Sequence, residues 1–171
     1  MRKMKGFSLI ELLIVVAIIL IIAAIAIPNL MRARMAANDS SAAASVRSIA
    51  TGEIAYSSAY PAVGFPLTLA TLGGAPPCTP GIATACLVDD YLATNGAGKG
   101  KSGYTFNATG SASAGSAIND QFYSTGTPLG ASQGSRAYCS VEDVVLRLQP
   151  SGTIALVPSY NACTVLNPMN N

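Results

Sequence analysis

Three segments with different patterns of apolar and polar residues follow one another along the 171-residue chain. Residues 7–27 are almost continuously apolar, because 15 of these 21 positions are Phe, Leu, Ile or Val. Residues 29–59 contain no proline, and apolar side chains recur there at helical spacing. From Pro61 onward the chain holds nine of its ten prolines and fourteen of its sixteen glycines. The pattern predicts an apolar helix over 7–28, its amphipathic continuation over 29–60 and a globular domain over 61–171.

The apolar segment is long enough to span a bilayer. As a helix, its 21 residues extend roughly 31 Å at about 1.5 Å per residue. Its apolar side chains favour membrane insertion by roughly 4–9 kcal/mol, whereas the one charged residue, Glu11, costs at most about 3 kcal/mol. We therefore expect a membrane-inserted helix.

A short basic leader, residues 1–6, precedes this helix and contains Arg2, Lys3 and Lys5. A secretory signal has its apolar core before the cleavage site, but here the apolar run follows Gly6. A cut after Gly6 would therefore remove the charges and leave the apolar helix on the mature protein. The positive-inside rule predicts that residues 1–6 are cytoplasmic and that the C-terminal domain lies on the other side of the membrane.

The second segment predicts the other half of one long helix, running from Phe7 to Ala59 and kinked near Pro28. Its apolar face carries Val46, Ile49, Ala50 and Ile54. The opposite, polar face is predicted to carry Asp39, Arg47 and Glu53. Such an apolar stripe requires a sheet to cover it.

The C-terminal domain is expected to begin with a connecting loop, residues 61–102, with little regular structure. An antiparallel meander over residues 103–157 should follow, because short β-prone runs alternate there with Gly, Pro and Ser. The clearest predicted hairpin joins the last two of these runs. The fold class is thus α+β, a long N-terminal helix packed on a C-terminal antiparallel sheet, with strands expected at Tyr104–Asn107, Gln121–Ser124, Ala137–Ser140, Val144–Leu148 and Thr153–Val157.

All four cysteines lie in the C-terminal domain. An even number of cysteines behind an export-type N-terminus favours disulfides over the zinc alternative, which needs closely spaced ligand pairs. Four cysteines can pair in three ways. We favour the connectivity whose two bridges close the shorter loops, Cys78–Cys86 and Cys139–Cys163. The second bridge would close the C-terminal segment onto the sheet.

The charge pattern and composition argue against a catalytic or nucleic-acid-binding role. The net charge of +2 becomes −1 without the leader, since seven basic residues then face eight acidic ones. The chain has no histidine, the commonest general base, and no clustered basic face for nucleic acid. We therefore expect no enzyme activity, no cofactor and no metal. The carboxylate pairs Asp89-Asp90 and Glu142-Asp143 fit solvated turns better than a calcium site.

The N-terminus resembles the prepilin signature shared by type IV pilins and by the pseudopilins of type II secretion. The resemblance rests on the run Gly6-Phe7-Ser8-Leu9-Ile10-Glu11 between the basic leader and the long apolar helix. It implies that prepilin peptidase cuts between Gly6 and Phe7 and methylates the new N-terminus. It further implies that Glu11 recruits the incoming subunit and that the helix loosens at Pro28. Many family members carry glycine where Leu20 stands here, which weakens the expectation of a melted segment.

The resemblance predicts a structural subunit of a type IV pilus, used for adhesion, motility or DNA uptake. The precursor would sit in the inner membrane, contact its lipid, and polymerise with itself on an inner-membrane assembly platform into an extracellular filament. The alternative is a pseudopilin, the subunit of a short periplasmic piston in protein secretion. The disulfides favour the pilus, because pseudopilins typically lack them.

Overall fold

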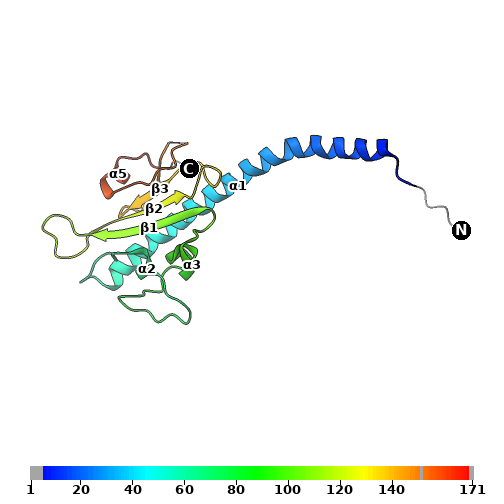
Figure 1. The fold of residues 1–171 in the computed structure, drawn as a ribbon. Coiled ribbons are helices and arrows are strands. Elements are labelled where there is room, and N and C mark those ends of the chain that lie inside the picture. The colour runs from blue at the N-terminus through cyan, green and yellow to red at the C-terminus, as the bar shows by residue number, and fades with distance from the viewer. Residues whose placement is uncertain (1–5, 151, 170–171) are drawn as a thin grey trace. The chain divides into compact units, whose positions relative to one another are not determined.

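The computed structural model (Figure 1) describes residues 6–150 and 152–169. The chain forms two compact units, one ending at Arg34 and the other beginning at Met35. The predicted basic residues of the leader, Arg2, Lys3 and Lys5, lie outside the described residues. The elements in chain order are α1 (Leu9–Ala59), α2 (Leu69–Leu72), α3 (Asp90–Ala93), α4 (Asn95–Gly98), β1 (Tyr104–Ser111), β2 (Gln121–Pro128), β3 (Tyr138–Val141), β4 (Arg147–Leu148) and α5 (Tyr160–Thr164).

Helix α1 contains both predicted helical segments as one continuous element of 51 residues. It begins two residues later than predicted, at Leu9, and ends at the predicted residue, Ala59. Tyr60 precedes Pro61, and a residue before proline disfavours the helical region, which explains this end. Pro28 lies inside the helix, with helical residues on both sides.

Four antiparallel strands form one sheet in the order β1-β2-β3-β4. Strands β1 and β2 pair over eight residues, from Tyr104 opposite Pro128 to Ser111 opposite Gln121. Strand β3 pairs with β2 over four residues and with β4 over two. The predicted α+β architecture, a long N-terminal helix with a C-terminal antiparallel sheet, is confirmed.

The predicted hairpin between Val144–Leu148 and Thr153–Val157 is wrong. Residues 153–157 form no strand, and the sheet ends at Leu148. The free edge of β4 is instead occupied by the C-terminal segment, because the Leu148 N–H donates to the Asn167 carbonyl at 3.2 Å and the Met169 N–H to the Leu146 carbonyl at 2.8 Å. The C-terminal segment, distant in sequence, therefore pairs with β4 in place of the neighbouring residues 153–157. The local sequence pattern does not reveal this pairing.

The apolar stripe of α1 forms one side of the main core. Ala42, Val46 and Ile49 are fully buried in one cluster with Tyr104, Phe106, Ala108 and Tyr138 of the sheet. Gly126 in β2 allows a close approach, since a Cβ atom there would lie 3.0 Å from Val46 Cγ2. The sheet predicted to cover the stripe therefore does so within the unit that begins at Met35.

The predicted polar face of α1 is exposed only in part. Arg47 is exposed, but Asp39 is half-buried and Glu53 is fully buried. Asp39 accepts hydrogen bonds from the Tyr104 hydroxyl at 2.5 Å and from the Ser135 N–H at 3.0 Å. Glu53 lies one position after Gly52, and a Cβ atom added at Gly52 would meet the side chains of Val88 and Leu72. The segment after α1 thus folds back over a helix face that the sequence pattern assigned to solvent.

Residues 61–102 contain two four-residue helices, α2 and α3, and the turn α4, whose Gly96 and Ala97 have left-handed backbone angles, where a loop with little regular structure was expected. The Asn95 side chain holds this segment to the edge of β1. Its amide donates to the Phe106 carbonyl at 2.7 Å and its carbonyl oxygen accepts from the Phe106 N–H at 2.5 Å. Asn95 therefore satisfies backbone groups at a sheet edge that would otherwise be unpaired.

The structure has two disulfides, Cys78–Cys86 and Cys139–Cys163, and both are the bridges favoured from the shorter loops. Both cysteines of the Cys139–Cys163 bridge are completely buried, and this bridge links β3 to α5. The first bridge lies in the 61–102 segment, where both of its residues are partly exposed. Its eight-residue separation closes a short loop that contains no helix or strand.

We predict that Glu53 makes the free energy of unfolding depend on pH. Burial raises the pKa of Glu53 from 4.5 to about 8, and among the described residues neither carboxylate oxygen has a hydrogen-bond partner. The titratable neighbour one turn along, Tyr56, has a pKa raised chiefly by burial. Since the folded state holds the Glu53 proton more tightly than the unfolded state, stability should fall as pH rises from about 4.5 to 8 and then level off.

The measurement is urea unfolding of the full chain in detergent micelles at a series of pH values. Glu53→Gln removes the ionisation at nearly constant volume, so its stability should decline less over this range and exceed that of the wild type at pH 8. Asp90→Asn, at the start of α3, is the matched control. Parallel pH profiles for Glu53→Gln and the wild type would contradict the buried position of Glu53.

We also predict that the two disulfides are reduced in a fixed order. An attacking thiolate must reach a sulfur atom, and only the Cys78–Cys86 bridge is partly exposed. Under native conditions dithiothreitol should reduce this bridge first, while Cys139–Cys163 resists until the domain unfolds. Pulsed alkylation with mass spectrometry measures both rates, and urea-unfolded protein is the control. Equal rates for the two bridges in the folded protein would show that the second bridge is accessible.

Candidate functional site

The residues of the predicted processing site, Gly6 and Phe7, precede α1 and are not helical. Both are exposed, and the Phe7 side chain is 78% accessible to solvent. Proteases bind the chain in an extended form, so a non-helical, uncovered peptide bond is the form that a peptidase needs. The structure thus leaves this bond accessible.

Glu11 caps the first turn of α1. Its carboxylate accepts a hydrogen bond from the Ser8 N–H at 2.9 Å. Ser8 is the residue before the first helical residue, and Glu11 is the third residue of the helix, so the two form half of a capping box. The negative charge also lies at the positive end of the helix dipole.

This local role of Glu11 was not predicted from the sequence. The signal was present, because Ser-x-x-Glu before an apolar run is the capping-box pattern. The cap explains why the helix begins at Leu9 and not at Phe7. Glu11 therefore has an intramolecular hydrogen-bond partner before any other chain is present.

The apolar half of α1 presents its large side chains on all sides. From Leu9 to Met31 its leucine, isoleucine, valine and methionine side chains are between 45% and 80% exposed. In the described residues, α1 is the one helix long and apolar enough to cross a membrane, judged by length and composition alone. A helix that is apolar all round needs lipid or other apolar helices around it.

Pro28, the predicted kink, lies inside α1 near the end of the apolar segment. Proline has no N–H, so the carbonyl of Ala24 four residues earlier receives no helical hydrogen bond from it. This is a weak point in the backbone ladder of α1. Loosening of the helix at Pro28 stays a prediction.

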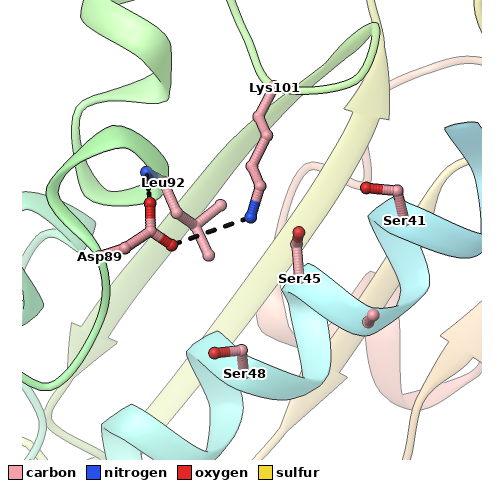
Figure 2. Close-up of a pocket in the computed structure, with 7 residues that line it drawn as sticks. Ser41, Ser45, Ser48, Asp89, Leu92 and Lys101 are labelled. Atoms are coloured by element: carbon pink, nitrogen blue, oxygen red, sulfur yellow. Dashed lines mark hydrogen bonds and ion pairs between the residues drawn. The ribbon is translucent and has the colours of Figure 1, made fainter.

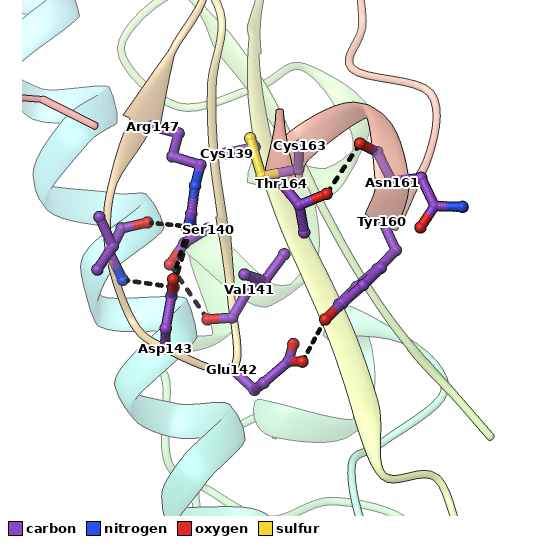
Figure 3. Close-up of polar contacts among 11 residues, drawn as sticks. Cys139, Ser140, Val141, Glu142, Asp143, Arg147, Tyr160, Asn161, Cys163 and Thr164 are labelled. Atoms are coloured by element: carbon purple, nitrogen blue, oxygen red, sulfur yellow. Dashed lines mark hydrogen bonds and ion pairs between the residues drawn. A yellow bond between two sulfur atoms is a disulfide. The ribbon is translucent and has the colours of Figure 1, made fainter. Parts of the chain in front are cut away.

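One of the two acidic pairs weighed as calcium ligands, Glu142-Asp143, is held by partners within the chain (Figure 3). Asp143 binds the Arg147 guanidinium through both oxygens, at 2.9 and 2.5 Å. This hydrogen bond lowers the pKa of Asp143. Glu142 accepts a short hydrogen bond from the Tyr160 hydroxyl, which raises the pKa of Tyr160 to about 12. In the described part of the chain, no group of three or more Cys, Asp or Glu residues is arranged to hold a metal ion.

The polar contacts of Figure 3 lie at the end of β3, in the same region as the buried disulfide between β3 and α5. Arg147 lies in β4, Glu142 and Asp143 follow β3, and Tyr160 begins α5. The Tyr160–Glu142 hydrogen bond therefore attaches α5 to the end of β3, beside Cys139–Cys163, whereas the Asp143–Arg147 pair joins the turn after β3 to β4. Their arrangement stabilises the C-terminal part of the domain.

Two comparisons with known proteins each match a short part of the chain. Residues 1–27 match the family model described as the prokaryotic N-terminal methylation motif. Over 39 residues the chain is 69% identical to the type IV wide pilus major component PilA4 of Thermus thermophilus. That similarity spans 23% of this chain and 30% of the relative, so it leaves most of both proteins uncompared. No solved structure matches the chain.

Proposed function

We infer that this chain, whose N-terminal segment is that of the type IV pilin family, is a structural subunit of a type IV pilus filament. The observation that carries the proposal is the exposed apolar half of α1, most of which lies within the matched methylation motif. Such a surface suits a subunit that is held first by lipid and then by the same helix of other copies. The similarity to a pilus major component of Thermus thermophilus supports the same role.

The proposed pathway begins with a precursor anchored in the inner membrane, with its leader on the cytoplasmic side. Prepilin peptidase would cut between Gly6 and Phe7 and methylate the new amine. The exposed, non-helical form of these residues supports access for such an enzyme. Because the cut removes only the basic leader, the apolar helix remains available for polymerisation on an assembly platform.

Glu11 is the proposed assembly residue. The cut creates a positively charged amine on Phe7, and an apolar helix bundle offers few other partners for either charge. At about 4 Å and an effective dielectric near 20, the attraction between the Phe7 amine and Glu11 of a neighbour is about 4 kcal/mol. In the isolated chain this carboxylate accepts from its own Ser8 N–H. Assembly would therefore add an ammonium partner at a carboxylate that the cap already orients.

As in the pilin family, the filament would serve adhesion, motility or DNA uptake. The role is structural and not catalytic, in keeping with the family. The mature subunit would reside in an extracellular filament, where two disulfides are suited to an oxidising environment. The pseudopilin alternative would keep the same processed chain in the periplasm.

The two functions of Glu11 can be separated by substitution. Glu11→Gln keeps a side-chain oxygen that accepts from the Ser8 N–H but removes the charge, whereas Glu11→Ala removes both. We predict that both variants are processed to the wild-type mature N-terminus. Because each lacks the charge, both should yield at least about tenfold fewer sheared filaments, given that losing one partner of a buried ion pair costs roughly 3–5 kcal/mol.

Glu53→Gln serves as the control, since it removes a carboxylate from the same helix but within the folded domain. Filament yield is measured by shearing cells and quantifying the chain in the pellet. If Glu11→Gln assembles normally and Glu11→Ala does not, the residue acts through the cap and the ion-pair mechanism fails. Normal assembly of both variants would remove Glu11 from the assembly site.

A further inference from the structure

A polar groove of about 260 Å³ lies between α1 and the segment that carries α3 (Figure 2). It belongs entirely to the unit that begins at Met35. Three serines of α1 line one side and an ion pair lines the other. We call it the serine groove, and its lining residues are Ser41, Ala44, Ser45, Ser48, Asp89, Leu92 and Lys101.

Ser45 is the informative residue of the serine groove. Its residue surface is 96% buried, since only 4% is exposed. In the described residues its hydroxyl makes no hydrogen bond, whereas Ser40 and Thr51 on the same helix donate back to the carbonyls of Ala36 and Arg47. Figure 2 shows the Ser45 oxygen turned toward the groove, below Lys101. The small exposed part of Ser45 therefore opens into the groove, where its unpaired hydroxyl is available to a ligand.

The ion pair on the opposite side also has unused hydrogen-bonding capacity. Lys101 Nζ lies 3.8 Å from Asp89 Oδ2, which is an ion pair but too long for a hydrogen bond. Asp89 Oδ1 is occupied, because it accepts from the Leu92 N–H at 2.8 Å and caps α3. Oδ2 and the three N–H groups of Lys101 are therefore positioned to bind hydroxyls of a ligand.

The charges of the serine groove select the class of ligand. The Asp89 carboxylate disfavours an anion, and the Lys101 ammonium disfavours a cation, so a neutral ligand fits best. The lining combines hydroxyls, a carboxylate and an ammonium, and the Leu92 side chain adds an apolar surface. This combination suits the hydroxyls and C–H face of a sugar ring, and the volume is too small for a drug-sized or larger ligand.

We propose that the serine groove binds one ring of a neutral sugar, with Ser45, Lys101 and Asp89 as its hydrogen-bonding residues. The site is a property of the folded domain and does not depend on filament formation. The sugar can be a free monosaccharide or the end of a glycan chain, since both present the same ring. The two sources are distinguished by the length of the probe.

The test uses the full chain in micelles of an amine-oxide detergent, because glycosidic detergents would compete for the site. Amide and side-chain NMR shifts are followed during titration with methyl glycosides of glucose, galactose, mannose and N-acetylglucosamine, with maltotriose, and with inorganic phosphate. We expect one or more sugars to shift resonances of the groove residues, with a dissociation constant in the millimolar range typical of few hydrogen bonds.

Two pairs of variants locate the site. Ser45→Ala removes the buried hydroxyl and should weaken sugar binding about tenfold, whereas Ser40→Ala removes an exposed hydroxyl of α1 outside the groove and should not. Lys101→Met removes the ammonium and should also weaken binding, whereas Lys99→Met, on the same loop but outside the groove lining, should not. Near-wild-type spectra of the variants verify that each one is folded.

Every outcome decides the proposal. Saturable shifts by a monosaccharide alone identify a free-sugar site, and equal or tighter binding of maltotriose identifies the end of a glycan. Binding of phosphate without any sugar would overturn the proposal in favour of an anion site. The absence of sugar binding, or sugar binding unaffected by Ser45→Ala and Lys101→Met, would also overturn it. Filament yield plays no part in these readouts, so a failure here leaves the proposed function unaffected.

Discussion

The structure depends on one constraint: half of a 51-residue helix exposes apolar side chains that its own chain does not cover. In water this surface would drive aggregation, whereas a bilayer or a bundle of like helices removes it from water. Under the proposed function, insertion first and polymerisation later would satisfy the same surface in two environments. The apolar side chains of the remaining half of α1 are covered within the chain itself, because Val46 and Ile49 are buried against the sheet.

The polar groups on α1 distinguish its two halves. Glu11 in the apolar half is capped only locally, by the Ser8 N–H, and so is available to a second partner. Asp39 is committed within its own domain, to Tyr104 and Ser135. Glu53 has no hydrogen-bond partner among the described residues, and the domain tolerates it by raising its pKa to about 8. The hydrogen bonds of Asp39, the two disulfides and the paired edge of β4 stabilise the folded domain. The buried carboxyl of Glu53 destabilises it when ionised.

The periodicity and length of apolar runs made α1, the strand-rich domain and the α+β class predictable, because these signals are local. The hairpin to residues 153–157 was wrong because the C-terminal segment around Asn167 competes for the same strand edge. Glu53 was assigned to solvent because nothing local shows that residues near Leu72 and Val88 fold over its side of α1. Ser8 was overlooked although its capping pattern is local, and Ser45 could not be found because a groove needs two distant segments to meet.

The most direct test of the central claim is the intact mass and N-terminal sequence of this chain in filaments sheared from the cell surface. Polymerisation through α1 after processing predicts a chain that begins at methylated Phe7, lacks residues 1–6 and is four hydrogens lighter for two disulfides. The same processed chain confined to membranes and periplasm would shift the assignment to a pseudopilin. A chain that still carries its leader would contradict the account.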